Sequence, residues 1–233
     1  MNSSVPTPGR GPLHVRVGQR MGGNGSAVGH EPKPVLLSPP AAHGRSPENE
    51  FQDGKLHPPW RWSAKHRAEW FSPTVHPGVL RLYPQIANPS LKKQPNLLLR
   101  KAPSRGFVVE TLLEFYPCQW SEEAGLVLMG RTCAALALRH DGLRNMVVLR
   151  INDAIKVIGP VSAHTAKLQM QMTNDGMCSF EVGTAGRTLA IPDHLQAAKG
   201  RGIVTRIGLY SIKRLEHSFS GCADFAGFKL RDR

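Results

Sequence analysis

Short apolar segments with alternating polarity recur along residues 79–233, separated by turn residues. The clearest pair is Leu168–Met172 and Cys178–Val182, which alternate with a period of two on either side of residues 174–176. That turn is Asn-Asp-Gly, whose residues tolerate positive φ and close antiparallel hairpins. The same pattern predicts strands at 79–83, 97–99, 107–115, 125–129, 133–138, 146–151, 188–191, 202–212 and 225–230, with weak helical periodicity around 193–199. Short strands at this spacing predict an all-β sandwich.

The first 56 residues have a different composition from the rest of the chain. They contain 8 Pro and 9 Gly, a density that interrupts both helices and strands. Apolar residues there are too sparse to bury much surface. The sequence therefore predicts a mostly irregular Pro/Gly-rich tail over residues 1–48 and one β-sandwich over residues 49–233.

The chain is strongly basic, with 30 Lys and Arg against 17 Asp and Glu and a formal net charge of +13. Such a charge raises the question of a polyanionic partner. The basic residues nevertheless stand singly within the predicted strands, as solvated outer positions of a sheet do: Arg81, Arg100, Lys101, Arg131, Arg139, Arg150, Lys167 and Arg187. No run of five basic residues and no nucleic-acid-binding signature occurs, so nucleic acid is not the expected partner.

Cysteine usage and hydropathy indicate an intracellular class of protein. The four cysteines contain no C-x-x-C pair, and Cys133 and Cys178 fall on apolar phases of their strands, which favours buried thiols and leaves a disulfide as the alternative. The N-terminus lacks the apolar run of a signal peptide, and no 18-residue apolar stretch is present. The expectation is a cytoplasmic chain without a membrane span.

An aromatic concentration precedes the first confident strand. It consists of Trp60, Trp62, Trp70 and Phe71. Exposed indoles can stack on the C–H faces of sugar rings. Buried ones would instead attach the leading segment to the sandwich through their large apolar area. The sequence leaves both alternatives open.

The order of the motifs resembles a known module. The motifs are Trp60-Arg61-Trp62, Trp70-Phe71-Ser72, Pro77 to Leu82, Pro95 to Leu99, Glu123 to Leu126, Leu136 to Arg139, Gly208 to Ser211 and Ala223-Asp224-Phe225. This series is similar to the C-terminal concanavalin A-like, or jelly-roll, β-sandwich of family 43 glycoside hydrolases of the β-xylosidase and α-arabinofuranosidase type. The resemblance covers about 180 residues in order.

The resemblance implies an accessory domain without catalytic residues of its own. Family members are inverting hydrolases whose carboxylates lie on an N-terminal β-propeller. The acidic residues of the tail, Glu31, Glu48, Glu50 and Asp53, match none of the propeller's catalytic motifs. The tail is similar to the last segment of that propeller, and a catalytic propeller is therefore the implied partner.

The resemblance also implies contacts with a sugar pocket and a structural ion. Phe51, Trp60 and Trp62 are the carbohydrate-contact candidates, because a loop of the sandwich borders the sugar pocket in relatives. Glu50 and Asp224 are the candidate ligands of a structural calcium. Asn49 and Ala226 replace two acids of the usual pattern, which weakens such a site.

Three functional hypotheses follow. The first is an accessory β-sandwich of a β-xylosidase-like glycoside hydrolase, inactive by itself. The second is a free-standing carbohydrate-binding module for xylo- or arabino-oligosaccharides, which needs a tryptophan exposed on one face. The third is a basic polyanion-binding protein.

Overall fold

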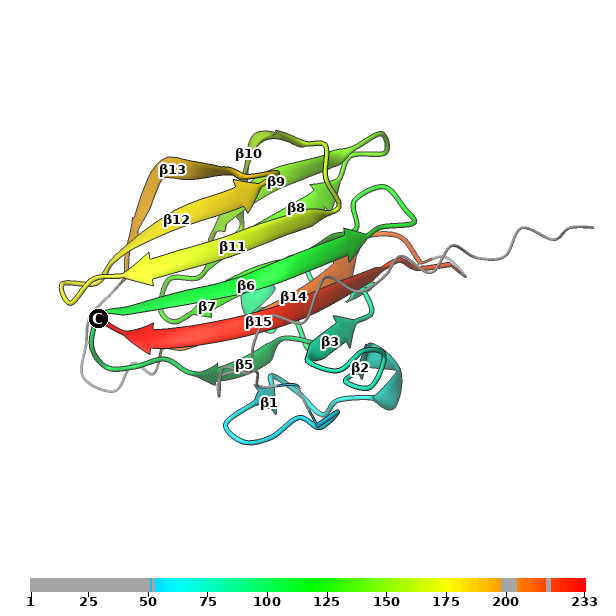
Figure 1. The fold of residues 1–233 in the computed structure, drawn as a ribbon, viewed down its shortest axis with the longest axis horizontal. Helices are drawn as coiled ribbons and strands as arrows, with labels where there is room; N and C mark the ends of the chain where they lie inside the picture. Colours follow the sequence, from blue (N-terminus) through cyan, green and yellow to red (C-terminus); the bar gives the residue numbers. More distant parts are fainter. Residues whose placement is uncertain (1–50, 52, 198–204, 217–218) are drawn as a thin grey trace, which may run out of the picture. The chain divides into compact units, whose positions relative to one another are not determined.

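The computed structural model describes residues 51, 53–197, 205–216 and 219–233. Within them the chain forms two layers of β-strands (Figure 1). The elements are β1 (Arg61–Trp62), η1 (Ala68–Trp70), β2 (Phe71–Ser72), β3 (Val79–Leu82), β4 (Gln85–Ile86), η2 (Leu91–Lys93), β5 (Leu98–Lys101), β6 (Phe107–Tyr116), β7 (Glu123–Met129), β8 (Ala134–His140), β9 (Asn145–Ile151), β10 (Ala154–Val161), β11 (Thr165–Met172), β12 (Met177–Thr184), β13 (Arg187–Gln196), β14 (Arg206–Lys213) and β15 (Cys222–Asp232). The prediction of an all-β sandwich is confirmed. The predicted tail over residues 1–48 lies outside the described residues.

Each layer is one sheet with a distinct strand order. The eight-stranded sheet runs β1-β5-β14-β7-β8-β9-β10, with β4 joining β14 in parallel. The seven-stranded sheet runs β13-β12-β11-β6-β15-β3-β2 and is antiparallel throughout. The last strand, β15, lies between β6 and β3, so the C-terminal residues are central to the fold.

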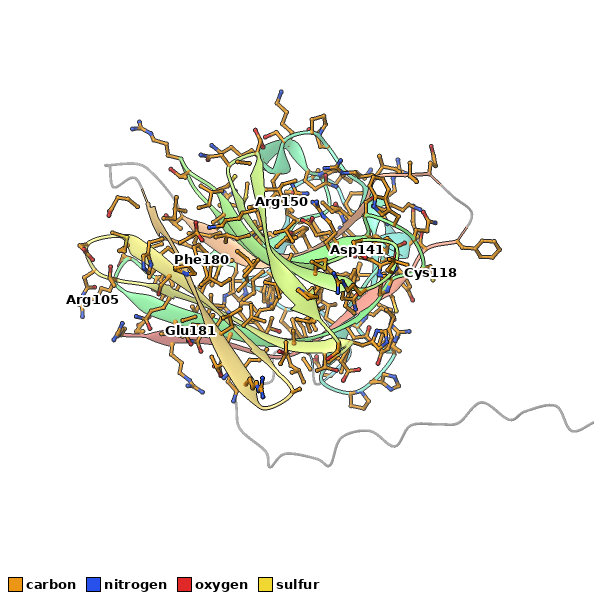
Figure 2. The ribbon with its side chains drawn as sticks, turned by 90° about the horizontal axis from the view of Figure 1, so that it is seen from above. Arg105, Cys118, Asp141, Arg150, Phe180 and Glu181 are labelled. Carbon is orange, nitrogen blue, oxygen red and sulfur yellow. The ribbon has the colours of Figure 1, made fainter. Side chains whose placement is uncertain are left out.

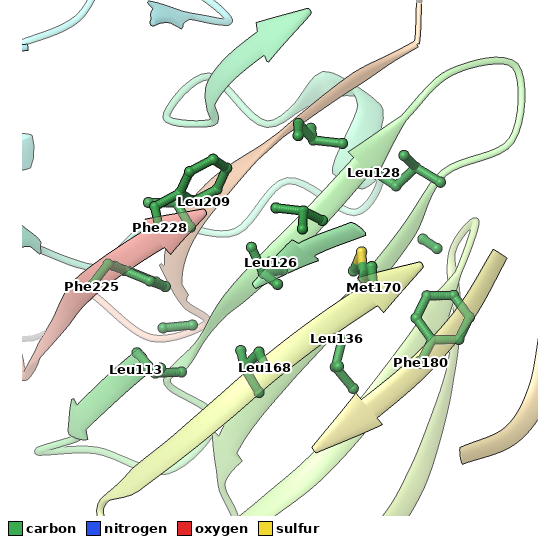
Figure 3. Close-up of a cluster of buried hydrophobic side chains, with 14 of the residues drawn as sticks. Leu113, Leu126, Leu128, Leu136, Leu168, Met170, Phe180, Leu209, Phe225 and Phe228 are labelled. Carbon is green, nitrogen blue, oxygen red and sulfur yellow. The ribbon is translucent and has the colours of Figure 1, made fainter. Parts of the chain in front are cut away.

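The main core fills the space between the two sheets. Strand β6 shows how the sequence builds it, because alternate residues from Phe107 to Phe115 are buried. Leu113 and Phe225 of the seven-stranded sheet and Leu126 and Leu209 of the other belong to the same cluster (Figure 3). Burial of such side chains contributes about 25 cal/mol per Å² of apolar surface. The two sheets are therefore held together by a continuous apolar layer.

A second apolar cluster covers the outer face of the eight-stranded sheet. It includes Leu97, Leu99, Val127, Val148 and Tyr210. Strands with both faces buried carry continuous apolar runs, and this explains why β5, β7 and β8 do not alternate. The expectation that the run 97–99 is covered on both faces is confirmed.

Two strands differ from the sequence expectation. Strand β10 was not expected, because as the terminal strand of its sheet it is largely exposed and shows no clean alternation. Strand β13 continues to Gln196, although residues 193–199 suggest weak helical periodicity. Both are edge strands and contain proline, Pro160 and Pro192, which an edge tolerates. No helix in the described part of the chain is long and apolar enough to span a bilayer.

Candidate functional site

The leading segment is attached to the sandwich by two of the three predicted carbohydrate-contact residues. Phe51 is fully buried and Trp60 is 8% exposed. The Trp60 ring centroid lies 5.9 Å from that of Phe51 and 4.8 Å from that of Phe228 on β15. The Arg100 guanidinium lies 5.7 Å from the Trp60 ring centroid. These contacts cover both rings, so the structure favours the packing alternative for Phe51 and Trp60.

Trp62, the third candidate, belongs to another group of aromatic side chains. Its ring centroid lies 5.7 Å from Trp70, 5.2 Å from Phe71 and 6.0 Å from His66. Trp70 is buried, whereas Trp62 is half-buried on the edge strand β1. A sugar contact by the leading segment therefore depends on Trp62, and it stays a prediction.

Asp224, the predicted calcium ligand, is bound by an arginine of the neighbouring strand. Arg81 on β3 pairs with Asp224 on β15 across the ladder. Its Nε and Nη2 donate to the two carboxylate oxygens, each at 2.6 Å. The hydrogen bonds to Asp224 raise the pKa of Arg81. Such a bidentate pair places a fixed positive charge where a cation would have to lie.

Both carboxylate oxygens of Asp224 are already engaged by Arg81, so this side chain is poorly placed to bind calcium. Calcium takes six to eight oxygen ligands, and both oxygens of Asp224 already accept from the guanidinium. Ala226 contributes a backbone carbonyl, which accepts from the Thr111 hydroxyl at 3.0 Å. Among the described residues no group of three His, Cys, Asp or Glu side chains is placed to hold a metal. Glu50 lies outside the described residues, so the calcium site stays a prediction.

A buried ionic cluster lies on the outer face of the eight-stranded sheet, centred on Glu123 of β7. Arg150 of β9 donates its Nε to Oε1 at 2.5 Å, and Arg139 of β8 donates its Nε to Oε2 at 2.7 Å. The Tyr210 hydroxyl of β14 donates to Oε1 at 2.6 Å. Four strands are thus joined through one carboxylate.

The two guanidiniums keep Glu123 ionised. Burial alone would raise the pKa of this carboxyl, but the charges of Arg150 and Arg139 and their hydrogen bonds hold it below its usual value. Burial and the Glu123 charge raise the pKa of Tyr210 well above its usual value. The prediction that the strand arginines are solvated is wrong for Arg150, which is 7% exposed. The physical reason is that its guanidinium reaches Glu123 of β7 across the intervening strand β8, a contact that the sequence of a single strand does not reveal.

Three loops are joined at one end of the sandwich, two by the buried carboxylate of Glu122 and the third by a backbone hydrogen bond. Its Oε2 accepts from the backbone N–H of Cys118 at 2.8 Å, and its Oε1 accepts from that of Gly221 at 3.0 Å. The N–H of Ser121 donates to the carbonyl of His140 at 2.8 Å. Figure 2 shows Cys118 and Asp141, from two of these loops, near each other at this end. The loops before β7, β9 and β15 therefore form one connected surface.

This loop surface carries large exposed apolar side chains. Trp120 is 52% exposed, Leu143 is 92% exposed and Phe219 is 78% exposed. Of the four tryptophans, Trp120 has by far the most accessible indole. Trp120 lies between the strands predicted at 107–115 and 125–129, but the sequence pattern alone does not show whether its indole is exposed.

The comparison with protein families identifies the sandwich. The model of the beta-xylosidase C-terminal concanavalin A-like domain matches residues 48–231. The chain belongs to this family. The match confirms the concanavalin A-like prediction and shows a glycoside hydrolase-related domain. No curated protein sequence matches the chain.

Solved structures share the fold at low sequence identity. The Bacteroides ovatus xyloglucan PUL GH43B structure has a TM-score of 0.69 and 19% identity, covering 84% of this chain and 41% of its own. The xylan beta-1,4-xylosidase of Bacillus halodurans has a TM-score of 0.65 and 19% identity, covering 83% and 41%. A functionally unknown protein from Saccharomyces cerevisiae has a TM-score of 0.54 and 9% identity, covering 78% and 98%. The chain thus spans about two fifths of the Bacteroides ovatus and Bacillus halodurans structures but nearly all of the yeast one.

Proposed function

We propose that this domain is an accessory β-sandwich of a β-xylosidase-like glycoside hydrolase and works with a catalytic domain of the GH43 type. The observation that supports it is the family match over residues 48–231, in a chain that covers 41% of the Bacteroides ovatus GH43B structure and 41% of the Bacillus halodurans xylosidase structure. The remainder of those structures is where the hydrolytic residues of such enzymes are expected. The role of the sandwich is then to support a catalytic domain in the metabolism of xylan- or arabinan-type glycans.

The carboxylates of the sandwich support a non-hydrolytic role. Glycoside hydrolysis needs a pair of carboxyl groups, one of which holds a proton through a raised pKa. Among the described residues the buried acids are already engaged: Glu122 by backbone N–H groups, Glu123 by two arginines and Asp224 by Arg81. Where a carboxyl pKa is displaced in this part of the chain, it is lowered. These acids are suited to structural roles.

The test of this proposal combines a hydrolysis assay with a binding assay. The purified chain should not hydrolyse p-nitrophenyl β-D-xyloside or the arabinofuranoside above the buffer rate. Co-expressed with a GH43 catalytic domain from the same genome, it should co-elute on size exclusion and raise the melting temperature of that domain. Turnover by the chain alone would show that it carries its own catalytic centre. If the chain formed a complex with none of the GH43 catalytic domains of that genome, the accessory role would be excluded.

A further inference from the structure

We propose that one end of the outer face of the eight-stranded sheet binds the phosphate backbone of a nucleic acid duplex, without reading its sequence. This basic surface consists of five exposed side chains from η2, β5, the β7–β8 turn and β14: Lys92, Lys93, Lys101, Arg131 and Arg206. The sequence contains no run of five basic residues, so it is the fold that brings these charges together. The inference goes beyond the accessory role and does not depend on it.

Lys101 and Arg206 lie directly opposite each other on neighbouring strands. Strands β5 and β14 pair antiparallel with Lys101 against Arg206, and Arg206 also lies opposite Met129 of β7. Both side chains share the outer face, because Leu99 and Tyr210, an even number of residues away on the same strands, belong to the second apolar cluster. Like charges directly opposite each other destabilise a strand pair. An anion bound between them would remove this repulsion.

The η2 segment and the β7–β8 turn add the other three charges. Leu91 of η2 belongs to the second apolar cluster, which places this segment and its two lysines on the same face of the sheet. The Nζ of Lys92 donates to the backbone carbonyl of Arg131. The turn also lies beside the residue that precedes β14, since a Cβ added to Gly130 would lie 3.7 Å from Oγ1 of Thr205. The five side chains therefore extend from one continuous surface.

Acidic side chains do not neutralise this basic surface. Within the part of the chain that the structure describes, none of its five residues forms an ion pair. At the other end of the same face, Arg139 and Arg150 are instead paired with Glu123. Asp153 of the β9–β10 turn lies near the basic surface, because its charge and that of Lys92 both act on the pKa of Cys133. One carboxylate against five cations leaves a surplus of positive charge, in a chain whose formal net charge is +13.

The density of charge favours a nucleic acid duplex over an acidic protein segment. Strands β5, β14 and β7 are neighbours in the sheet, and three strands about 4.8 Å apart span about 10 Å. A duplex presents one phosphate per about 1.7 Å of its axis, hence about six over this distance. An extended protein segment presents a side chain to one face only every 6.6 Å or so, hence about two. Single-stranded nucleic acid would need exposed aromatic side chains for stacking, and Trp120 and Phe219 lie in loops at the other end of β7.

The binding experiment uses the full chain and a fluorescent DNA duplex of about 20 base pairs and arbitrary sequence, followed by anisotropy. The wild type should bind it with a micromolar Kd in about 50 mM salt, and log K should fall with log salt at a slope of about −4. The double variant Lys101→Gln, Arg206→Gln should weaken binding about tenfold and bring the slope to about −2, because two phosphate contacts are lost. Its melting temperature should stay unchanged or rise, since the two opposed charges are gone.

The matched control is the double variant Lys65→Gln, Arg187→Gln, which removes two exposed basic charges outside the basic surface. It has the same net charge as the first double variant and should bind the duplex as the wild type does. Equal loss of binding in the two double variants would show that net charge alone attracts the duplex, and would overturn the proposal. Absence of duplex binding by the folded wild-type chain in low salt would overturn it as well. Tighter binding of poly-L-glutamate than of the duplex would assign the surface to an acidic protein instead, again against the proposal.

Discussion

At the scale of single residues, the sandwich places buried charges where they neutralise one another. Glu123 has no exposed surface and accepts from Arg139, Arg150 and Tyr210. A carboxylate in such surroundings contributes little net stability compared with an apolar residue. Removing it leaves two guanidiniums without a counter-charge, which is costly. The cluster therefore makes the structure sensitive to the charge of one side chain.

Replacement of Glu123 by Gln should reduce the free energy of unfolding by about 3–5 kcal/mol at neutral pH. Because the folded-state pKa of Glu123 is lowered, its contribution is present above the unfolded-state pKa and is lost as the pH falls through the folded-state value. The difference between wild type and variant should therefore shrink in acid. Urea unfolding at pH 7 and below pH 4 measures this. Asp193→Asn, at an exposed pair with Lys156, is the control and should cost about 1 kcal/mol or less.

At the scale of elements, the sequence specified the strands whose side chains alternate and did not specify the contacts between strands. The hairpin of β11 and β12 and the burial of alternate residues in β6 follow from local pattern alone. The partners of Glu123 and the exposure of Trp120 depend on sheet order and loop packing, which no single segment encodes. The edge strand β10 was missed because it buries little and so carries no periodic signal.

Close packing between strands makes two glycines of the eight-stranded sheet irreplaceable. A Cβ on Gly125 of β7 would lie 2.2 Å from the carbonyl oxygen of Leu136, and one on Gly208 of β14 would lie 1.9 Å from that of Leu98. These are backbone atoms that cannot rotate away. Gly125→Ala should therefore reduce the free energy of unfolding by about 3 kcal/mol or more, measured by urea denaturation.

The control for this substitution is on the edge strand of the same sheet. A Cβ on Gly159 of β10 would meet no atom within 4 Å. Gly159→Ala should leave stability nearly unchanged. Equal effects of Gly125→Ala and Gly159→Ala would show that backbone freedom, rather than strand packing, sets the cost.

At the scale of the whole molecule, the described residues form a sandwich whose core contains side chains from both ends of the described sequence. The apolar layer between the sheets includes Phe51 and Trp60 at one end of the sequence and Phe228 at the other. The structure from Saccharomyces cerevisiae shares this fold over 98% of its own chain. The family match likewise begins at residue 48. These observations favour a domain that folds without residues 1–48.

A chain that begins at residue 49 should therefore unfold cooperatively, with a melting temperature close to that of the full chain. A chain that begins at residue 61 lacks Phe51 and Trp60, and with them the ring contacts of Trp60 with Phe51 and with Phe228, so it should lose several kcal/mol of stability. Calorimetry of the three chains measures both effects. If removal of residues 1–48 alone lowered the melting temperature as much as the longer deletion, the boundary at residue 49 would be wrong. The tail would then belong to the folding unit, because its own contacts would supply stability that the sandwich core lacks.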